Sequence, residues 1–112
     1  MMILKIHDLE ALEKLLKTHK DIVAIFKSTQ CIDCDYLDQY IDKIIKPFEN
    51  MLFISVYRHE LPEVFKHYHV FGVPSFLYFS HGKLKQSLIN KRRKHPEDVT
   101  AFLQKVKALK EG

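Results

Sequence analysis

One stretch of sequence decides the fold, and it reads Ile22-Val23-Ala24-Ile25-Phe26-Lys27-Ser28-Thr29-Gln30-Cys31-Ile32-Asp33-Cys34. Its first five residues form a continuous apolar run of strand length, which is typical of a central strand buried on both faces. Polar residues follow, and two cysteines then stand at the start of a helical pattern. The stretch therefore predicts a buried strand that ends in a turn and carries two thiols to the beginning of a helix.

Apolar residues recur with strand or helix periodicity on both sides of this stretch. Strands are expected over 2–6, 51–57, 74–79 and 84–89, with a hairpin turn over 80–83. Helices are expected after Asp8, over 37–48, after Pro62 and after Pro96. The order β-α-β-α-β-α-β-β-α predicts an α/β fold, in which a mixed central sheet is flanked by helices on both faces.

Length and composition restrict the class of protein. The chain has 112 residues, of which 46% are hydrophobic and 29% are charged, so we expect a single globular domain over residues 1–112. Two cysteines exclude a disulfide scaffold and an all-cysteine zinc site within one chain, and three glycines exclude a Gly-rich phosphate loop. The net charge of +4 is a weak argument for nucleic acid, which we do not expect as a partner.

The first residues do not read as a targeting signal. Lys5, His7 and Asp8 interrupt the apolar run before it reaches the length of a signal peptide, and no stretch approaches the ~20 apolar residues of a membrane span. We therefore expect a cytoplasmic protein without a membrane partner. In a reducing compartment two cysteines are reactive or metal-binding more often than they form a structural bridge.

The C-x-x-C segment Cys31-Ile32-Asp33-Cys34 carries the chemistry. Cys31 is expected at the helix N-terminus, where free N–H groups and the helix dipole favour the thiolate that attacks disulfides. Cys34 lies one turn later on the same side, within reach of Cys31. These positions predict an intramolecular disulfide, with Cys31 as the attacking cysteine and Cys34 as the resolving one.

Two other interpretations of the cysteines remain open from the residues alone. In the first interpretation the pair forms half of a zinc site, which His59, His67 or His69, or a second chain, would complete. In the second interpretation the two cysteines are inert. The placement between a strand and a helix favours redox chemistry, so no metal ligand is assigned.

The segment Gly72-Val73-Pro74 gives a second signal. A proline at the start of a central strand interrupts the hydrogen-bond ladder unless its position is special, and a cis peptide bond beside an active site is one such case. The alternative is an ordinary trans proline that begins a strand. A third segment, Lys91 to His95, is the densest block of positive charge, and we expect it to be a solvated loop before the last helix.

Together these residues resemble the thioredoxin superfamily over nearly the whole chain, and most resemble its divergent members in Gram-positive bacteria. The resemblance rests on the apolar strand, the C-x-x-C motif, the segment from Gly72 to Ser75, the hairpin at Gly82 and the closing amphipathic helix. It implies a thiol–disulfide oxidoreductase in which a cis Pro74 packs against Cys31. It also implies a substrate groove lined by Gln30, Ile32, Asp33 and Val73.

The chain departs from the family pattern at several positions. Gln30 replaces the tryptophan before the motif, and Ile-Asp replaces Gly-Pro within it. The buried acid of the family falls on Ile25 and the lysine that accompanies it falls on Ser55, so the pair that handles the proton of the resolving thiol is absent. Asp33 places a negative charge near both sulfurs, and we expect it to oppose formation of the Cys31 thiolate.

The sequence thus predicts a monomeric dithiol–disulfide oxidoreductase. Its substrates would be disulfides of proteins or of low-molecular-weight thiols, and its electrons would come from a reductase or a thiol. No cofactor is expected beyond the redox-active pair Cys31 and Cys34. Two alternatives remain: a binding or scaffold module with weak redox turnover, and a dimer that binds metal through the C-x-x-C motif.

Overall fold

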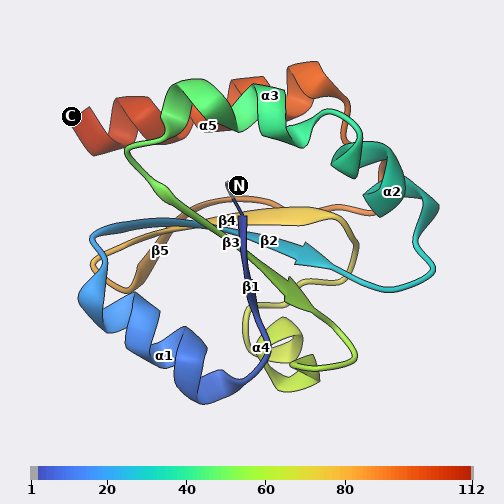
Figure 1. The fold of residues 1–112 in the computed structure, drawn as a ribbon, viewed down its shortest axis with the longest axis horizontal. Helices are drawn as coiled ribbons and strands as arrows, with labels where there is room; N and C mark the ends of the chain where they lie inside the picture. The colour runs from blue at the N-terminus through green and yellow to red at the C-terminus, as the bar shows by residue number, and fades with distance from the viewer. Residues whose placement is uncertain (1–2, 112) are drawn as a thin grey trace.

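A computed structural model describes residues 3–111 of the chain. Five strands form one mixed sheet, with helices above and below it (Figure 1). The strands are β1 Ile3–Ile6, β2 Asp21–Lys27, β3 Leu52–Tyr57, β4 Ser75–Ser80 and β5 Lys83–Leu88. The helices are α1 Leu9–Thr18, α2 Ile32–Asp38, α3 Ile41–Ile45, the 3₁₀ turn η1 Lys46–Phe48, α4 Pro62–His67 and α5 Pro96–Glu111.

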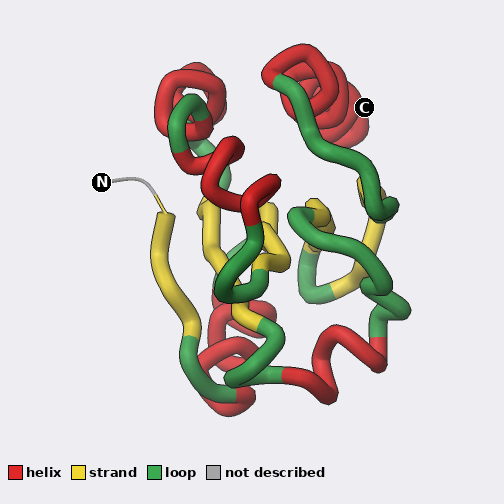
Figure 2. The backbone as a smooth tube through the Cα atoms, turned by 90° about the vertical axis from the view of Figure 1, so that its right-hand side faces the viewer, coloured by secondary structure: helices red, strands yellow, loops and turns green. Residues whose placement is uncertain are grey.

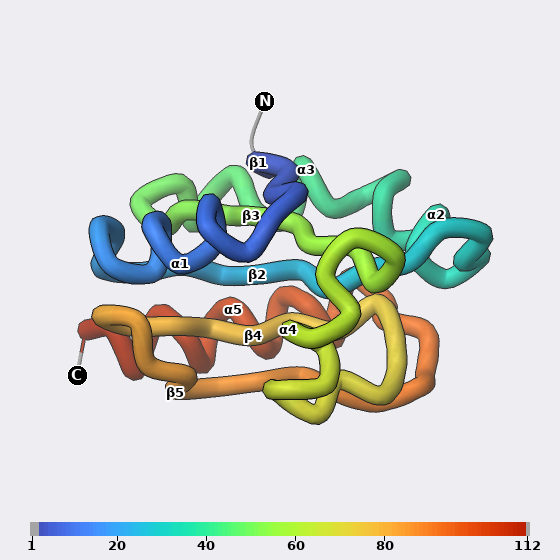
Figure 3. Tube along the Cα trace, turned by 90° about the horizontal axis from the view of Figure 1, so that it is seen from below, coloured from blue at the N-terminus to red at the C-terminus, as the bar shows by residue number. Residues whose placement is uncertain are grey.

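The sheet has the strand order β1-β3-β2-β4-β5, which places β2 at its centre. β2 pairs in parallel with β3 and antiparallel with β4, and β5 returns beside β4 as the edge of a hairpin. The strands lie in this order when the molecule is seen from the side of α1 and α4 (Figure 3). The predicted mixed α/β fold is confirmed. The first strand is described over Ile3–Ile6, and Met2, with which the expected strand begins, lies outside the described residues.

Both faces of β2 are buried, as the continuous apolar run predicts. Val23 and Ile25 contribute to the core beneath α3 and α5, whereas Ala24 and Phe26 contribute to the core above α1 and α4. Figure 2 shows this layering edge-on, with the strands between two groups of helices. Because alternate side chains of a strand point to opposite faces, only a strand with a helix layer on each side buries such a run completely.

Local signals set the ends of the helices. The Asp8 carboxylate accepts a 2.8 Å hydrogen bond from the backbone N–H of Ala11 and caps α1, as predicted. Pro62 and Pro96 each begin a helix, where the missing proline N–H has no acceptor to lose. None of the helices within residues 3–111 is both long and apolar enough to cross a membrane.

The single helix expected over 37–48 is wrong. The chain forms two short helices, which are separated at Gln39 and Tyr40, and then a 3₁₀ turn. The N–H groups of Gln39 and Tyr40 bond to carbonyls three residues back instead of four, and Tyr40 leaves the helical region with φ −126° and ψ −12°. The tightened turn separates α2, which carries the cysteines, from α3, which packs on the sheet.

Gly72 marks a close approach between two loops. A Cβ atom at this position would collide with the backbone carbonyl of Asn90 and would lie 2.8 Å from the Cα atom of Lys91. The absence of a side chain therefore lets the segment before β4 pack directly against the segment after β5.

Replacing Gly72 by alanine should force these two loops apart. We expect Gly72→Ala to lower the free energy of unfolding in urea by about 1–3 kcal/mol, the range typical of overpacking. Ser87→Ala on the exposed strand β5 is the control and should change stability by less than about 0.5 kcal/mol. Equal stability of the Gly72→Ala variant and the wild type would show that the loops yield without cost.

Candidate active site

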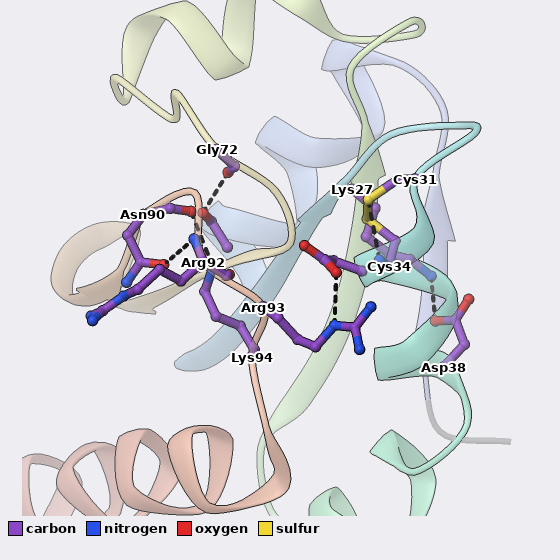
Figure 4. The surroundings of a disulfide bond; sticks show 11 residues. Lys27, Cys31, Cys34, Asp38, Gly72, Asn90, Arg92, Arg93 and Lys94 are labelled. Carbon is purple, nitrogen blue, oxygen red and sulfur yellow. Dashed lines mark hydrogen bonds and ion pairs between the residues drawn. A yellow bond between two sulfur atoms is a disulfide. The ribbon is translucent and has the colours of Figure 1, made fainter.

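The two cysteines form a disulfide at the end of β2. The chain leaves the strand at Lys27, turns through Gln30 in the left-handed region with φ 54°, and reaches Cys31 at the N-cap of α2. Cys31 and Cys34 are joined by a disulfide with their Cα atoms 5.2 Å apart (Figure 4). The predicted strand–turn–helix placement of the motif is confirmed.

The two sulfur-bearing residues differ in exposure. Cys34 is buried, with 2% of its surface exposed, whereas Cys31 is half-buried at the rim. The backbone N–H of Cys34 donates a 3.1 Å hydrogen bond to Cys31 Sγ. An N–H that points at this sulfur stabilises negative charge on it once the disulfide is reduced.

The proline segment lies at the same end of the sheet as the motif. The Val73–Pro74 peptide bond is cis. β4 runs antiparallel to β2 with Ser75 opposite Phe26, so Pro74 comes beside the end of β2 from which the chain turns toward Cys31. The Ser75 hydroxyl donates a 2.6 Å hydrogen bond to the Gly72 carbonyl and fixes this turn.

Exposed apolar side chains lie in the cysteine motif and next to the proline segment. Ile32, between the cysteines, is 75% exposed, and Phe71, just before the proline segment, is 61% exposed. Val73 is half-buried and Gln30 is exposed. The sequence analysis included Ile32 but missed Phe71, whose signal is an aromatic residue directly before Gly72.

The region under the disulfide carries no charge at the two positions where the family has its proton-handling pair. Ile25 and Ser55 are 1% and 3% exposed and lie opposite each other in adjacent strands. Their register explains how an acid and a lysine at these positions would meet. An isoleucine cannot accept a proton, so this route is closed here.

A different ion pair lies on the same side of β2, and the sequence analysis missed it. Lys27 Nζ donates a 2.6 Å hydrogen bond to Asp38 Oδ1, and the two side chains are 11% and 49% exposed. Burial alone lowers the pKa of Lys27, but the hydrogen bond and charge of Asp38 outweigh it and raise the pKa above its usual value. Lys27 therefore stays protonated beside the disulfide (Figure 4).

Strand alternation contains the signal that could have found this pair. Lys27 is two residues after Ile25, which places both side chains on one face of β2, and Asp38 is one helical turn after Cys34. A lysine at the end of a buried strand needs a partner on the element that covers it. The partner cannot be identified from the sequence alone, because it depends on where α2 lies over the strand.

The expectation of a solvated loop over 91–95 is wrong for one residue. Lys91, Arg92 and Arg93 are exposed, but Lys94 is only 1% exposed. Its Nζ donates hydrogen bonds to the carbonyls of Asn90 and Arg92 at 3.0 and 2.7 Å. Lys94 folds back into its own loop, because its ammonium group satisfies carbonyl oxygens that would otherwise lack donors.

This burial changes the ionisation of Lys94. Desolvation lowers its pKa to about 8, and the positive charge of Arg92 acts in the same direction. The negative charges of Asp33 and Asp98 act against this shift and offset only part of it. Asp33 acts on Lys94 because the loop lies close to the cysteine motif, where Arg93 bonds to Asp33.

Asp33 is not the free carboxylate that the sequence suggested. Its Oδ1 accepts a 2.8 Å hydrogen bond from Arg93 Nε, across a separation of 60 residues. The Arg93 guanidinium also lies over the Tyr36 ring, 4.7 Å from its centroid. The charge expected to oppose the Cys31 thiolate is therefore paired with a cation.

The histidines considered as zinc ligands do not join the cysteines. Within residues 3–111 no group of three or more His, Cys, Asp or Glu residues gathers in a way that could hold a metal ion. His67 packs against Tyr68, and the His59 ring lies 5.9 Å from that of Tyr57. These contacts do not favour the metal-binding alternative.

The chain belongs to the thioredoxin family. The family model described as Thioredoxin matches residues 3–105. The five-stranded sheet and the disulfide after its central strand agree with this assignment. A C-x-x-C disulfide on this fold defines the protein as a thiol–disulfide oxidoreductase.

Individual proteins agree with the family assignment. The chain is 32% identical to Thioredoxin-2 of Pyricularia oryzae over 68 residues, and this aligned segment covers 61% of this chain and 40% of that protein. It is 25% identical to Thioredoxin H3 of Arabidopsis thaliana over 100 residues, and this alignment covers 89% of this chain and 82% of that protein. The structure of oxidised thioredoxin from Plasmodium falciparum has the same fold, with a TM-score of 0.81, 15% identity and coverage of 93% and 97%.

The Lys27–Asp38 pair gives a prediction about stability. Asp38→Asn leaves a nearly buried ammonium group without its anionic partner, and we expect it to lower the free energy of unfolding by about 1–2 kcal/mol. Lys27→Met leaves a carboxylate that water still reaches and should cost less than about 1 kcal/mol. Urea unfolding of the two oxidised variants measures the difference, and a larger loss for Lys27→Met would contradict this account.

The pKa of Lys94 gives a prediction about pH. The unfolded chain keeps the Lys94 proton up to the ordinary pKa of 10.5, whereas the folded chain releases it near 8. Between these values the unfolded state binds more protons, so this group makes stability rise with pH. We expect wild-type stability, relative to that of Lys94→Met, to increase by about 2 kcal/mol between about pH 8 and 10. A difference that stays constant over this range would refute the shifted pKa.

Proposed function

We propose that the protein reduces or exchanges disulfides of proteins or of low-molecular-weight thiols, with Cys31 as the nucleophile and Cys34 as the resolving cysteine. The observation that carries this proposal is the disulfide between a half-buried Cys31 and a buried Cys34. Attack on a substrate disulfide requires a sulfur that the substrate can approach. The more exposed Cys31 sulfur therefore attacks, and the buried Cys34 sulfur reacts in the second step.

The reaction consists of two exchanges at sulfur. The Cys31 thiolate attacks one sulfur of the substrate disulfide, which forms a mixed disulfide and releases the other substrate sulfur as a thiolate that takes up a proton. The Cys34 thiolate then attacks Cys31 Sγ, which forms the Cys31–Cys34 disulfide and releases the second substrate thiol. Two electrons pass to the substrate, and a reductase or a thiol must return them to the protein.

The second exchange requires Cys34 to lose its proton. Neither Ile25 nor Ser55 provides a carboxylate or an amine under the disulfide. We infer that the proton leaves through solvent at the rim and that resolution is slower than in relatives with a buried acid. The Lys27 ammonium, which stays protonated beside Asp38, provides positive charge on the same face of β2.

The surface around Cys31 suits an extended substrate segment. Pro74 shapes one side of the groove, and the backbone of Val73 pairs with the substrate chain in the manner of the family. Ile32 and Phe71 supply apolar contacts, since both are largely exposed. Gln30 and Asp33 border the motif and complete the proposed groove.

We further infer a cytoplasmic, monomeric protein that needs no cofactor beyond its two cysteines. A dithiol that passes electrons to substrates needs a reducing pool to regenerate it, and the cytoplasm provides one. The bacterial origin suggested by the C-I-D-C motif stays a prediction.

Removing each cysteine tests the proposed roles. The wild type should accelerate the reduction of insulin by dithiothreitol, and Cys31→Ser should abolish that acceleration, because no other thiol can attack first. Cys34→Ser should instead accumulate a stable mixed disulfide between Cys31 and its substrate, which mass spectrometry identifies.

Two outcomes would contradict the proposal. Adducts found only on Cys34 would reverse the assigned roles. A wild type that forms its disulfide without accelerating insulin reduction would favour a binding or scaffold module. Ser28→Ala, close to the motif in sequence but outside it, serves as the control and should retain the activity of the wild type.

A further inference from the structure

The pair formed by Asp33 and Arg93 joins the cysteine motif to a distant loop. Asp33 stands between the two cysteines, and its Oδ1 accepts the 2.8 Å hydrogen bond from Arg93 Nε. The two side chains are 32% and 43% exposed, so solvent screens the pair only partly. No other charged side chain lies within the four residues of the motif.

The loop that carries Arg93 is held in place by contacts on both sides of that residue. The Tyr40 hydroxyl donates a 2.6 Å hydrogen bond to the Lys94 carbonyl, which ties the loop to the segment after α2. The Arg92 N–H donates to Asn90 Oδ1 at 2.9 Å, which closes a turn within the loop. The backbone at Arg93 is therefore held in place. From it the Arg93 side chain extends over the Tyr36 ring to Asp33.

The charged groups around the disulfide come from three elements. The segment before β4 brings none, because Val70 to Ser75 contains no ionisable side chain. The groups are Lys27 on β2, Asp33, Asp35 and Asp38 on α2, and Arg92, Arg93, Lys94 and His95 on the loop after β5, where His95 contacts Tyr36 of α2. Asp38 is paired with Lys27, and Asp35 is exposed to solvent, which leaves Asp33 as the acid that most directly opposes a thiolate at Cys31.

We propose that Arg93 is a positioning residue of the exchange reaction, which offsets the charge of Asp33 and thereby keeps the Cys31 thiolate available near neutral pH. This inference rests on the proposed function, because it assigns the attack to Cys31. Its physical basis is simple: a carboxylate within the motif repels a second negative charge on sulfur, and a guanidinium bonded to that carboxylate cancels most of its field.

The test measures how readily Cys31 ionises, without requiring turnover. Reduced protein is alkylated with iodoacetamide over a range of pH, and the adduct on Cys31 is followed by mass spectrometry. We expect Arg93→Gln to raise the midpoint of this curve by about 0.5 pH unit, which is about a threefold loss of thiolate at neutral pH. Asp33→Asn should lower the midpoint, since it removes the opposing charge.

A double variant separates action through Asp33 from direct action on sulfur. If Arg93 works by neutralising Asp33, adding Arg93→Gln to the Asp33→Asn variant should move the midpoint by less than about 0.2 pH unit. Equal shifts in both backgrounds would overturn the proposed route through Asp33. If Arg93→Gln alone leaves the midpoint of the otherwise wild-type protein unchanged, the proposal is overturned altogether.

Two matched controls exclude simple explanations. Arg92→Gln removes the same charge from the adjacent position of the same loop and should leave the midpoint unchanged. An equal shift with Arg92→Gln would show a general effect of net charge and would contradict a role for the pair. Arg93→Lys keeps the charge and should restore a midpoint near that of the wild type, whereas failure of this rescue would point to a structural role of the guanidinium.

The failure of this inference is distinguishable from the failure of the proposed function. Insulin reduction that depends on Cys31, together with an unmoved midpoint in Arg93→Gln, would reject the charge role and keep the oxidoreductase. A shifted midpoint in a protein that reduces no disulfide would keep the pair and reject the activity. Urea unfolding of each variant verifies that the variants are folded under the conditions in which their alkylation midpoints are compared.

Discussion

Burial of β2 on both faces is the constraint on which the rest of the structure depends. Val23 and Ile25 on one face and Ala24 and Phe26 on the other require a helix layer on each side, and both edges of β2 are paired, by β3 and by β4. A strand in this position ends where its apolar run ends. The polar residues that follow reach the rim of the sheet, so the cysteine motif begins there, at the start of α2.

Two cation–carboxylate pairs then fix the short helix that carries the motif. Lys27 holds Asp38 from the central strand, and Arg93 holds Asp33 from the loop after β5. α2 has only seven residues and is separated from α3, so contacts within the helix alone would hold it weakly. The same contacts that anchor the helix also set the charge around the sulfurs, which couples the position of the disulfide to its reactivity.

The core beneath the disulfide is apolar where related proteins have an ionisable pair. Ile25 and Ser55 face each other without a proton donor or acceptor suited to a thiol. Charged groups stand instead at the rim, as the Lys27 side chain at the end of the strand and the Lys94 side chain within its loop, and both are themselves buried. Because neither Ile25 nor Ser55 can take the proton of the resolving thiol, the proposed exchange relies on solvent for this proton transfer rather than on a fixed buried group.

The sequence by itself determined the order of the strands and helices, the place of the cysteines and the helix cap at Asp8, because apolar periodicity and capping act over a few residues. Only the tertiary structure decided that Lys94 is buried, that Arg93 meets Asp33, and that the helix over 37–48 breaks near Tyr40. Charged residues have the same pattern in sequence whether they face water or a partner. Pairing across 60 residues depends on how the loop after β5 passes the motif, and local periodicity does not contain that geometry.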